Sequence, residues 1–183
     1  MKVHTFKIGG IHPDENKLSN DVVTQPAPLP KQPIFPMSQH IGAPAKPVVK
    51  KGDKVKVGTM IAEAAGFVSA PIYSSVSGTV LKVDNAIDAS GYMRPAVVIS
   101  VEGDEWEESI DRSTKLETLE SHPELTPEEI VERIKKAGVV GMGGAGFPTY
   151  AKLSDKADTI IMNCAECEPL LKLHRQLLKE HVH

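Results

Sequence analysis

The segment at residues 137–153, "AGVVGMGGAGFPTYAKL", places four glycines within the six residues from Gly141 to Gly146. Glycine loses more backbone entropy on folding than any other residue, so this density destabilises a loop that only reverses the chain. The pattern therefore indicates a loop whose backbone must come very close to another group. The nature of that group constrains both the fold and the function.

The residues alone allow two interpretations of this loop. Gly141, Gly143 and Gly146 match the dinucleotide pattern G-x-G-x-x-G, but that pattern requires a preceding strand. Here only two valines separate the loop from a predicted helix. A cradle of bare backbone N–H groups, for a phosphate or a flat ring, is favoured instead. The alternative is a turn whose glycines only permit close packing.

Residues 38–104 are predicted to form a small all-β unit, because short Val- and Ile-rich runs alternate there with glycine breaks. The run "VVKKGDKVKVGTMIAEAAGFVSAPIYSSVSGTVLKV" resembles the biotinyl/lipoyl family of barrel-sandwich folds. Carrier members of that family bear an acylated lysine at a hairpin tip, where this chain has Gly66. Without an amine nucleophile there is no carrier chemistry, so we interpret the unit as structural or docking.

Two helices are predicted in the second half of the chain. Thr126, Pro127 and Glu129 form the capping signature of a helix that ends at Gly138. The leucines of "PLLKLHRQLLKEHVH" suggest an amphipathic helix near the end of the sequence. Between these helices, residues 158–163 are predicted to form a short buried strand.

The motif "NCAECEP" follows the predicted strand, and ligands in open α/β sheets bind at the carboxyl ends of strands. The Asn163 amide can donate to and accept from a heterocycle. Glu166 and Glu168 can accept hydrogen bonds from ribose hydroxyls or a ring N–H. A strand-end turn with solvated acids is an equally good interpretation of this motif alone.

Composition excludes several classes of function. With 183 residues, a net charge of −3 and 4% aromatic residues, the chain lacks the charge and the stacking surface of a nucleic-acid binder. It shows neither a signal peptide nor a membrane-spanning run, so we expect a cytoplasmic protein able to dock on a membrane partner. Cys164 and Cys167 are too few for an iron–sulfur cluster within the chain, whereas a redox disulfide stays open.

The motifs "GMGGAGFPTYAKL" and "NCAECEP", in this order, resemble the flavin-binding subunit of respiratory complex I. Together with the leader "GGIHPDENK" and the lysine-less barrel, they resemble the RnfC family of the membrane-bound Rnf ion-translocating electron transport complexes. The resemblance implies an oxidoreductase subunit that passes electrons between NADH and ferredoxin through FMN and iron–sulfur clusters. It also implies partner subunits in the complex and a peripheral position on the cytoplasmic side of the bacterial inner membrane.

The resemblance also assigns residues to the cofactor site. The implied FMN and NADH contacts are Gly141, Gly143, Gly144, Gly146, Phe147, Lys152, Asn163, Glu166, Cys167 and Glu168. This sequence departs from the complex I pattern at Met142 (arginine there), Ala165 (aspartate) and Cys167 (serine). The loss of an acid weakens the expectation of NADH oxidation more than that of flavin binding.

The expected fold is multi-domain and α+β, with an all-β barrel-sandwich hybrid followed by the start of an α/β flavin-binding domain. The expected boundaries are a leader packing on the β unit at 1–37, the barrel-sandwich unit at 38–104, an acidic linker at 105–125 and the flavin domain from 126 to 183. The family continues beyond this point, so we expect the two [4Fe–4S] clusters in a further C-terminal part and no activity from these residues alone.

Two other functions stay open from the sequence. In the first, the leader and barrel dock on partner subunits as a scaffold, and the glycine loop binds no flavin. In the second, the chain is an independent NAD-binding enzyme, which the missing strand before Gly141 counts against.

We predict that the β unit carries no lipoyl or biotinyl group, because Gly66 removes the side chain that would accept one. Intact mass and peptide mapping of the purified protein should show residues 60–72 unmodified. An acyl or biotin adduct in this segment would contradict the interpretation of the barrel as a non-carrier module.

Overall fold

The structure is a computed structural model. The residues that it describes are 14, 16–18, 21–113, 118–154, 157–159, 161, 163, 166 and 172–180. The chain divides into two compact units, one spanning Leu29–Lys156 and the other combining Met1–Pro28 with Ala157–His183.

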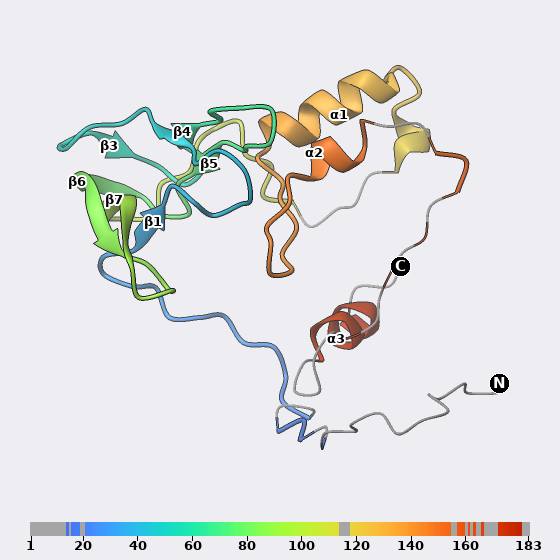
Figure 1. Ribbon diagram of the computed structural model, residues 1–183, viewed down its shortest axis with the longest axis horizontal. Helices are drawn as coiled ribbons and strands as arrows, with labels where there is room; N and C mark the ends of the chain where they lie inside the picture. Colours follow the sequence, from blue (N-terminus) through green and yellow to red (C-terminus); the bar gives the residue numbers. More distant parts are fainter. Residues whose placement is uncertain are drawn as a thin grey trace. The chain divides into compact units, whose positions relative to one another are not determined.

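The unit Leu29–Lys156 is built on two small antiparallel sheets (Figure 1). One sheet has the strand order β1-β7-β6-β3 and the other β2-β4-β5. The strands are β1 (Ile34–Pro36), β2 (Lys46–Pro47), β3 (Lys54–Val55), β4 (Met60–Glu63), β5 (Ile72–Tyr73), β6 (Gly78–Ile87) and β7 (Met93–Val101). The predicted all-β unit is therefore confirmed.

One apolar core lies between the two sheets. In strand β7, consecutive residues are buried on opposite faces. Val97 and Ile99 are fully buried in this core, whereas Val98 belongs to a second, smaller cluster. Successive side chains of a strand point to opposite faces, so the central strand needs apolar residues at consecutive positions. The buried residues of the main core are Phe35, Met37, Ala45, Val55, Ile61, Ala62, Ile72, Val76, Val80, Val97 and Ile99.

The proline-rich segment before the barrel contributes its last residues to the fold. Strand β1 pairs with β7 in the register Phe35 to Val97, and the Met37 N–H donates to the Pro95 carbonyl at 2.9 Å. Met37 is almost completely buried. Three residues are too few to be recognised as a strand from their own pattern, because the strand exists only through pairing with β7.

Helix α1 (Pro127–Lys136) begins at the predicted N-cap. The Glu129 N–H donates to the Thr126 hydroxyl at 3.2 Å, and the Thr126 N–H donates to the Glu129 carboxylate at 2.9 Å. The helix ends before Gly138, whose φ of +68° is the left-handed conformation that favours glycine. A short 3-10 helix (Leu119–Ser121) precedes α1, and α2 (Thr149–Lys152) follows the glycine loop.

The second unit contains α3 (Leu173–Glu180), which confirms the predicted C-terminal helix. The Lys172 ammonium donates to the Val22 carbonyl at 3.3 Å, and the Thr24 hydroxyl donates to Glu180 at 3.2 Å. Residues 22–24 therefore bond to the ends of this helix. Among the described residues, none of the helices is both long and apolar enough to cross a bilayer.

The predicted buried strand at residues 158–163 is wrong for the part that the structure describes. Residues 158, 159, 161 and 163 belong to no strand, and Ile161 is 86% exposed. An apolar run forms a buried strand only where a sheet receives it, and no strand of this unit is found among its described residues.

The capping box gives α1 a testable pH dependence. Hydrogen bonds from the backbone N–H and hydroxyl of Thr126 lower the pKa of Glu129. The stabilisation of α1 by the ionised Glu129 carboxylate is fully present above the ordinary glutamate pKa. It is lost as the pH falls through the lowered pKa of Glu129. The protection factors of the α1 amides, which compare observed with intrinsic exchange at each pH, should therefore fall on acidification.

Glu129→Gln keeps an acceptor for the Thr126 N–H and should flatten this acid dependence, whereas Glu128→Gln is the matched control and should preserve it. Thr126→Ala should destabilise the helix by about 1 kcal/mol at neutral pH. Equal acid profiles for the two Gln variants would contradict the role of the capping box.

Candidate functional site

The glycine loop is closed at its base by a short ladder of backbone contacts. The Gly141 N–H donates to the Phe147 carbonyl at 2.8 Å, and the Thr149 N–H donates to the Val139 carbonyl at 3.0 Å. Val140 and Pro148 form an antiparallel bridge between these bonds. The ladder leaves residues 142–146 as a projecting tip, which we call the glycine tip.

Two glycines of this region are explained by packing against the barrel. A Cβ at Gly146 would lie 2.6 Å from the Gln39 carbonyl oxygen, and one at Gly138 would lie 2.6 Å from the Pro71 carbonyl oxygen. Both residues have positive φ, +58° and +68°. Only glycine combines this conformation with this close approach. The close-packing interpretation therefore accounts for Gly138 and Gly146.

Gly143 and Gly144 have no such explanation. A Cβ at either position would meet nothing within 4 Å, and neither residue has the positive φ that favours glycine. Both are exposed, and the neighbouring Met142 side chain is 92% exposed. Within the described part of the chain, the only backbone bond from the N–H groups of residues 142–146 is that of Gly146 to the Gly143 carbonyl. The fold itself does not require bare backbone at Gly143 and Gly144.

Two further candidate residues lie at the base of the loop. The Lys152 ammonium is 5.5 Å from the centre of the Phe147 ring. A Cβ at Gly141 would lie 3.6 Å from Phe147 backbone atoms and 3.9 Å from the Lys152 Nζ. The loop therefore gathers an exposed cation, a half-buried aromatic ring and a bare backbone.

The candidate residues of the second motif belong to the other unit. Glu166 accepts a hydrogen bond from the backbone N–H of Arg175 at 3.1 Å, so it satisfies a donor in the first turn of α3. Its second oxygen lies 3.3 Å from the Nδ1 of His174, which is an ion-pair distance without hydrogen-bond geometry. Asn163 is also engaged in an interaction. The expectations for Cys167 and Glu168 lie outside the described residues.

A buried histidine lies where the loop meets the barrel, and no sequence pattern around it predicted this. His40 is 7% exposed, and its Nε2 accepts a hydrogen bond from the Ala70 N–H at 3.1 Å. With Nε2 assigned as the acceptor, Nδ1 carries the proton and donates to the Ile41 carbonyl at 3.1 Å. The Ile41 N–H in turn donates to the Ala145 carbonyl of the glycine tip at 3.0 Å.

Two tyrosines add further links that the sequence did not reveal. The buried Tyr150, which follows the loop, donates its hydroxyl to the Phe67 carbonyl. The Lys135 ammonium lies 5.4 Å from the centre of the Tyr150 ring. Tyr73 of β5 donates its hydroxyl to the Lys136 carbonyl at the end of α1. These bonds attach α1, the loop and α2 to the barrel.

Beside these links, a cavity of about 230 Å³ lies where the barrel meets the residues after α1. His40, Tyr73 and Gly138 are among its lining residues. It is too small for a dinucleotide, and its wall is formed by the same residues that join the loop to the barrel.

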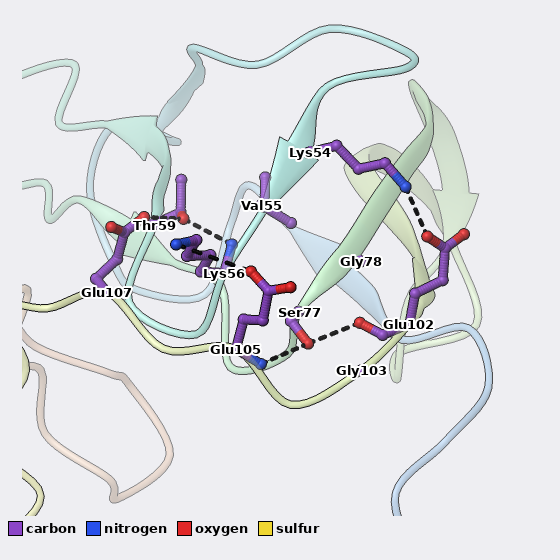
Figure 2. Close-up of a pocket in the computed structure, with 10 residues that line it drawn as sticks. All are labelled: Lys54, Val55, Lys56, Thr59, Ser77, Gly78, Glu102, Gly103, Glu105 and Glu107. Carbon is purple, nitrogen blue, oxygen red and sulfur yellow. Dashed lines mark hydrogen bonds and ion pairs between the residues drawn. The ribbon is translucent and has the colours of Figure 1, made fainter.

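A larger cleft, of about 560 Å³, lies elsewhere on the barrel (Figure 2). Lys54 bonds to Glu102 at 2.7 Å, and hydrogen bonds from Lys54 and Thr79 hold the pKa of Glu102 below its ordinary value. Lys56 lies 3.8 Å from Glu105. Both lysines of this cleft are thus paired with glutamates, Glu107 accepts from the Thr59 hydroxyl, and these contacts fasten residues 102–107 to the barrel. Its lining residues are Lys54, Val55, Lys56, Thr59, Ser77, Gly78, Glu102, Gly103, Glu105 and Glu107.

Metal binding has no support in the part of the chain that is described. No group of three or more His, Cys, Asp or Glu side chains is placed to hold an ion there. The glycine loop is therefore the candidate site that the geometry supports best.

Comparison with known proteins identifies the family. Residues 4–104, more than half of the chain, match the model of the RnfC barrel sandwich hybrid domain. The chain belongs to the RnfC family. This confirms the barrel-sandwich fold class and the resemblance inferred from the sequence. In this RnfC-family chain, residues 134–183 also match the model of the Nuo51 FMN-binding domain.

Several curated relatives, each named as one subunit of an oxidoreductase complex, are similar over most of the chain. The relative from the proton-translocating ferredoxin:NAD(+) oxidoreductase complex of Clostridium ljungdahlii is 43% identical over 175 residues, which cover 89% of this chain and 36% of the relative. The relative from the Na(+)-translocating ferredoxin:NAD(+) oxidoreductase complex of Acetobacterium woodii is 43% identical, and the match covers 97% of this chain and 40% of the relative. The relative from the ion-translocating oxidoreductase complex of Pseudomonas aeruginosa is 39% identical, and the match covers 97% of this chain and 23% of the relative. The RnfC-family chain thus spans less than half the length of these relatives.

The two kinds of glycine should differ sharply in their effect on stability. Gly146→Val should destabilise the barrel-and-loop unit by about 2 kcal/mol or more, because it forces a branched residue into positive φ against the Gln39 carbonyl. Gly143→Val should change the free energy of unfolding by less than about 1 kcal/mol. Denaturant unfolding of both variants measures this difference, and equal losses would contradict the division between packing and open glycines.

Proposed function

We propose that this chain is part of the RnfC-type subunit of an Rnf complex, in which electrons pass between NADH and ferredoxin through FMN and the passage is coupled to ion translocation. The relatives that it resembles are named as subunits of such oxidoreductase complexes. In this proposal the glycine tip holds FMN. The [4Fe–4S] clusters lie outside these residues, and the protein sits on the cytoplasmic face of the membrane against its partner subunits.

The observation that supports FMN binding is the pair of open glycines. Gly143 and Gly144 leave space where a side chain would otherwise stand, and the fold gives no reason for their identity. A flat ring can approach such a backbone to van der Waals distance, and backbone N–H groups there can donate to its polar edge. The residues at this site therefore fit a flat, polar-edged cofactor.

The residues at the base of the loop suit the same ligand. The Lys152 ammonium supplies a positive charge beside the loop, which favours the anionic, reduced form of a flavin. The half-buried Phe147 ring supplies apolar surface close to the same backbone. The chemistry that FMN supplies when bound is the exchange of a hydride for single electrons.

Roles for the second motif rest on the resemblance alone. We propose that Asn163, Glu166 and Cys167 contact the flavin and that Glu168 lies near the nicotinamide nucleotide. Glu166 is engaged with the first turn of α3, so flavin contact would require it to serve both partners or to exchange them.

A scaffold without flavin is the second candidate. It is favoured by the three bonds that attach α1, the loop and α2 to the barrel and by the packing explanation of Gly138 and Gly146. In that case the barrel would dock on partner subunits, and the loop would only pack against the barrel without binding a cofactor. The two candidates differ in what they require of Gly143.

Gly143→Val in the complete protein tests this difference. The variant should lose FMN on purification and bind it at least tenfold more weakly on titration, while its melting temperature stays close to that of the wild type. Ala89→Val adds bulk in an exposed turn between β6 and β7 and is the matched control. Normal FMN occupancy in Gly143→Val would contradict the glycine tip as the flavin site, and a wild type that itself binds no FMN would favour the scaffold.

A further inference from the structure

The tip of the hairpin between β4 and β5 carries an exposed aromatic residue that the fold does not explain. This hairpin corresponds to the one that bears the acylated lysine in carrier proteins, and here its tip contains Gly66 and Phe67. The Phe67 side chain is 78% exposed. At this exposure the ring contributes little to the core and is available for contact with a ligand.

The backbone of this tip is fixed rather than loose. The Ala65 N–H donates to the Ser69 hydroxyl at 3.0 Å, and this hydroxyl donates to the Ala43 carbonyl at 2.9 Å. The Ala43 N–H donates to the Val68 carbonyl at 3.0 Å. Ser69 is completely buried. The exposed ring of Phe67 is therefore presented from a backbone that is bonded on both sides.

The same tip lies beside the glycine loop. Ile41 bonds to Ala145 of the glycine tip, and Ala43, two residues further on, bonds to Val68. Two residues span at most about 7 Å of chain between these bonds. In addition, the Phe67 carbonyl accepts the hydroxyl of Tyr150, the second residue of α2, which follows the loop. The hairpin tip and the glycine loop are therefore bonded to the same short segment, residues 41–43.

We propose that the hairpin tip of the barrel is the second wall of the ring-binding site, and that Phe67 stacks on the flat heteroaromatic ring held by the glycine tip. Aromatic rings prefer offset-stacked contacts with such rings, and a fixed aromatic residue loses little entropy when it makes one. This inference rests on the proposed function, because it assumes a ring at the loop. The isoalloxazine of FMN and the nicotinamide of NADH share this chemistry.

The test uses the complete protein and three substitutions of Phe67. Phe67→Ala removes the ring, Phe67→Leu keeps apolar bulk without a stacking face, and Phe67→Tyr keeps the face. Tyr92→Ala is the matched control, because Tyr92 is a 67% exposed aromatic residue on the turn between β6 and β7. FMN affinity and bound-flavin fluorescence are measured by titration, KM and kcat for NADH by steady-state kinetics, and stability by thermal unfolding.

We expect Phe67→Ala and Phe67→Leu to weaken one ligand roughly threefold to tenfold, and Phe67→Tyr to restore wild-type affinity. Weaker FMN binding with brighter bound flavin assigns the contact to the isoalloxazine. Unchanged FMN binding with a raised KM for NADH and an unchanged kcat assigns it to the nicotinamide nucleotide. The melting temperatures should stay equal.

Two results would overturn the inference, and they are distinguishable. In the first, the wild type binds FMN, and Phe67→Ala gives the same ligand measurements as the wild type or as Tyr92→Ala. The hairpin tip is then not a wall of the site, and the proposed function stands. If the wild type itself binds no FMN, the proposed function fails and the inference fails with it.

Discussion

A buried histidine lies at the seam between the glycine loop and the barrel. His40 accepts from the Ala70 N–H on one side and donates to the Ile41 carbonyl on the other, so a single imidazole satisfies polar groups at the seam. Ile41 then bonds to Ala145, and the His40 backbone is in close contact with Gly146. Buried polar groups without partners are costly, so a side chain with one donor and one acceptor suits this position. The ring thus supports the segment whose backbone bonds to the loop, beside the two tyrosine bonds that attach α1 and α2.

Features set by neighbouring residues could be predicted from the sequence. The capping box of Thr126 and Glu129, the stop at Gly138 and the absence of a carrier lysine at Gly66 all depend on a few consecutive positions, and the structure has the helix as predicted. The glycine loop was also recognisable as a special backbone. The sequence could not separate its packing glycines from its open ones, because that distinction depends on where the barrel lies.

Features set by distant partners could not be predicted. Strand β1 has three residues and exists because β7 pairs with it, more than 50 residues further along the chain. The links made by His40 and Tyr150 join positions 30 and 83 residues apart. Conversely, a strand was predicted where none is found: the apolar run at residues 158–163 has the composition of a strand, but its described residues form none. Composition gives a tendency, and the available sheet edge decides the outcome.

The short strands at the edges of both sheets affect how copies of this barrel behave when crowded. The edge strands are β1 and β3 in one sheet and β2 and β5 in the other. They are two or three residues long, β1 ends in Pro36, β2 consists of Lys46 and Pro47, β3 begins with Lys54, and Pro71 directly precedes β5. Proline cannot donate to a neighbouring strand, and lysine opposes burial against one. Crowded copies of this barrel would thus find little backbone to pair with at β1, β2, β3 and β5.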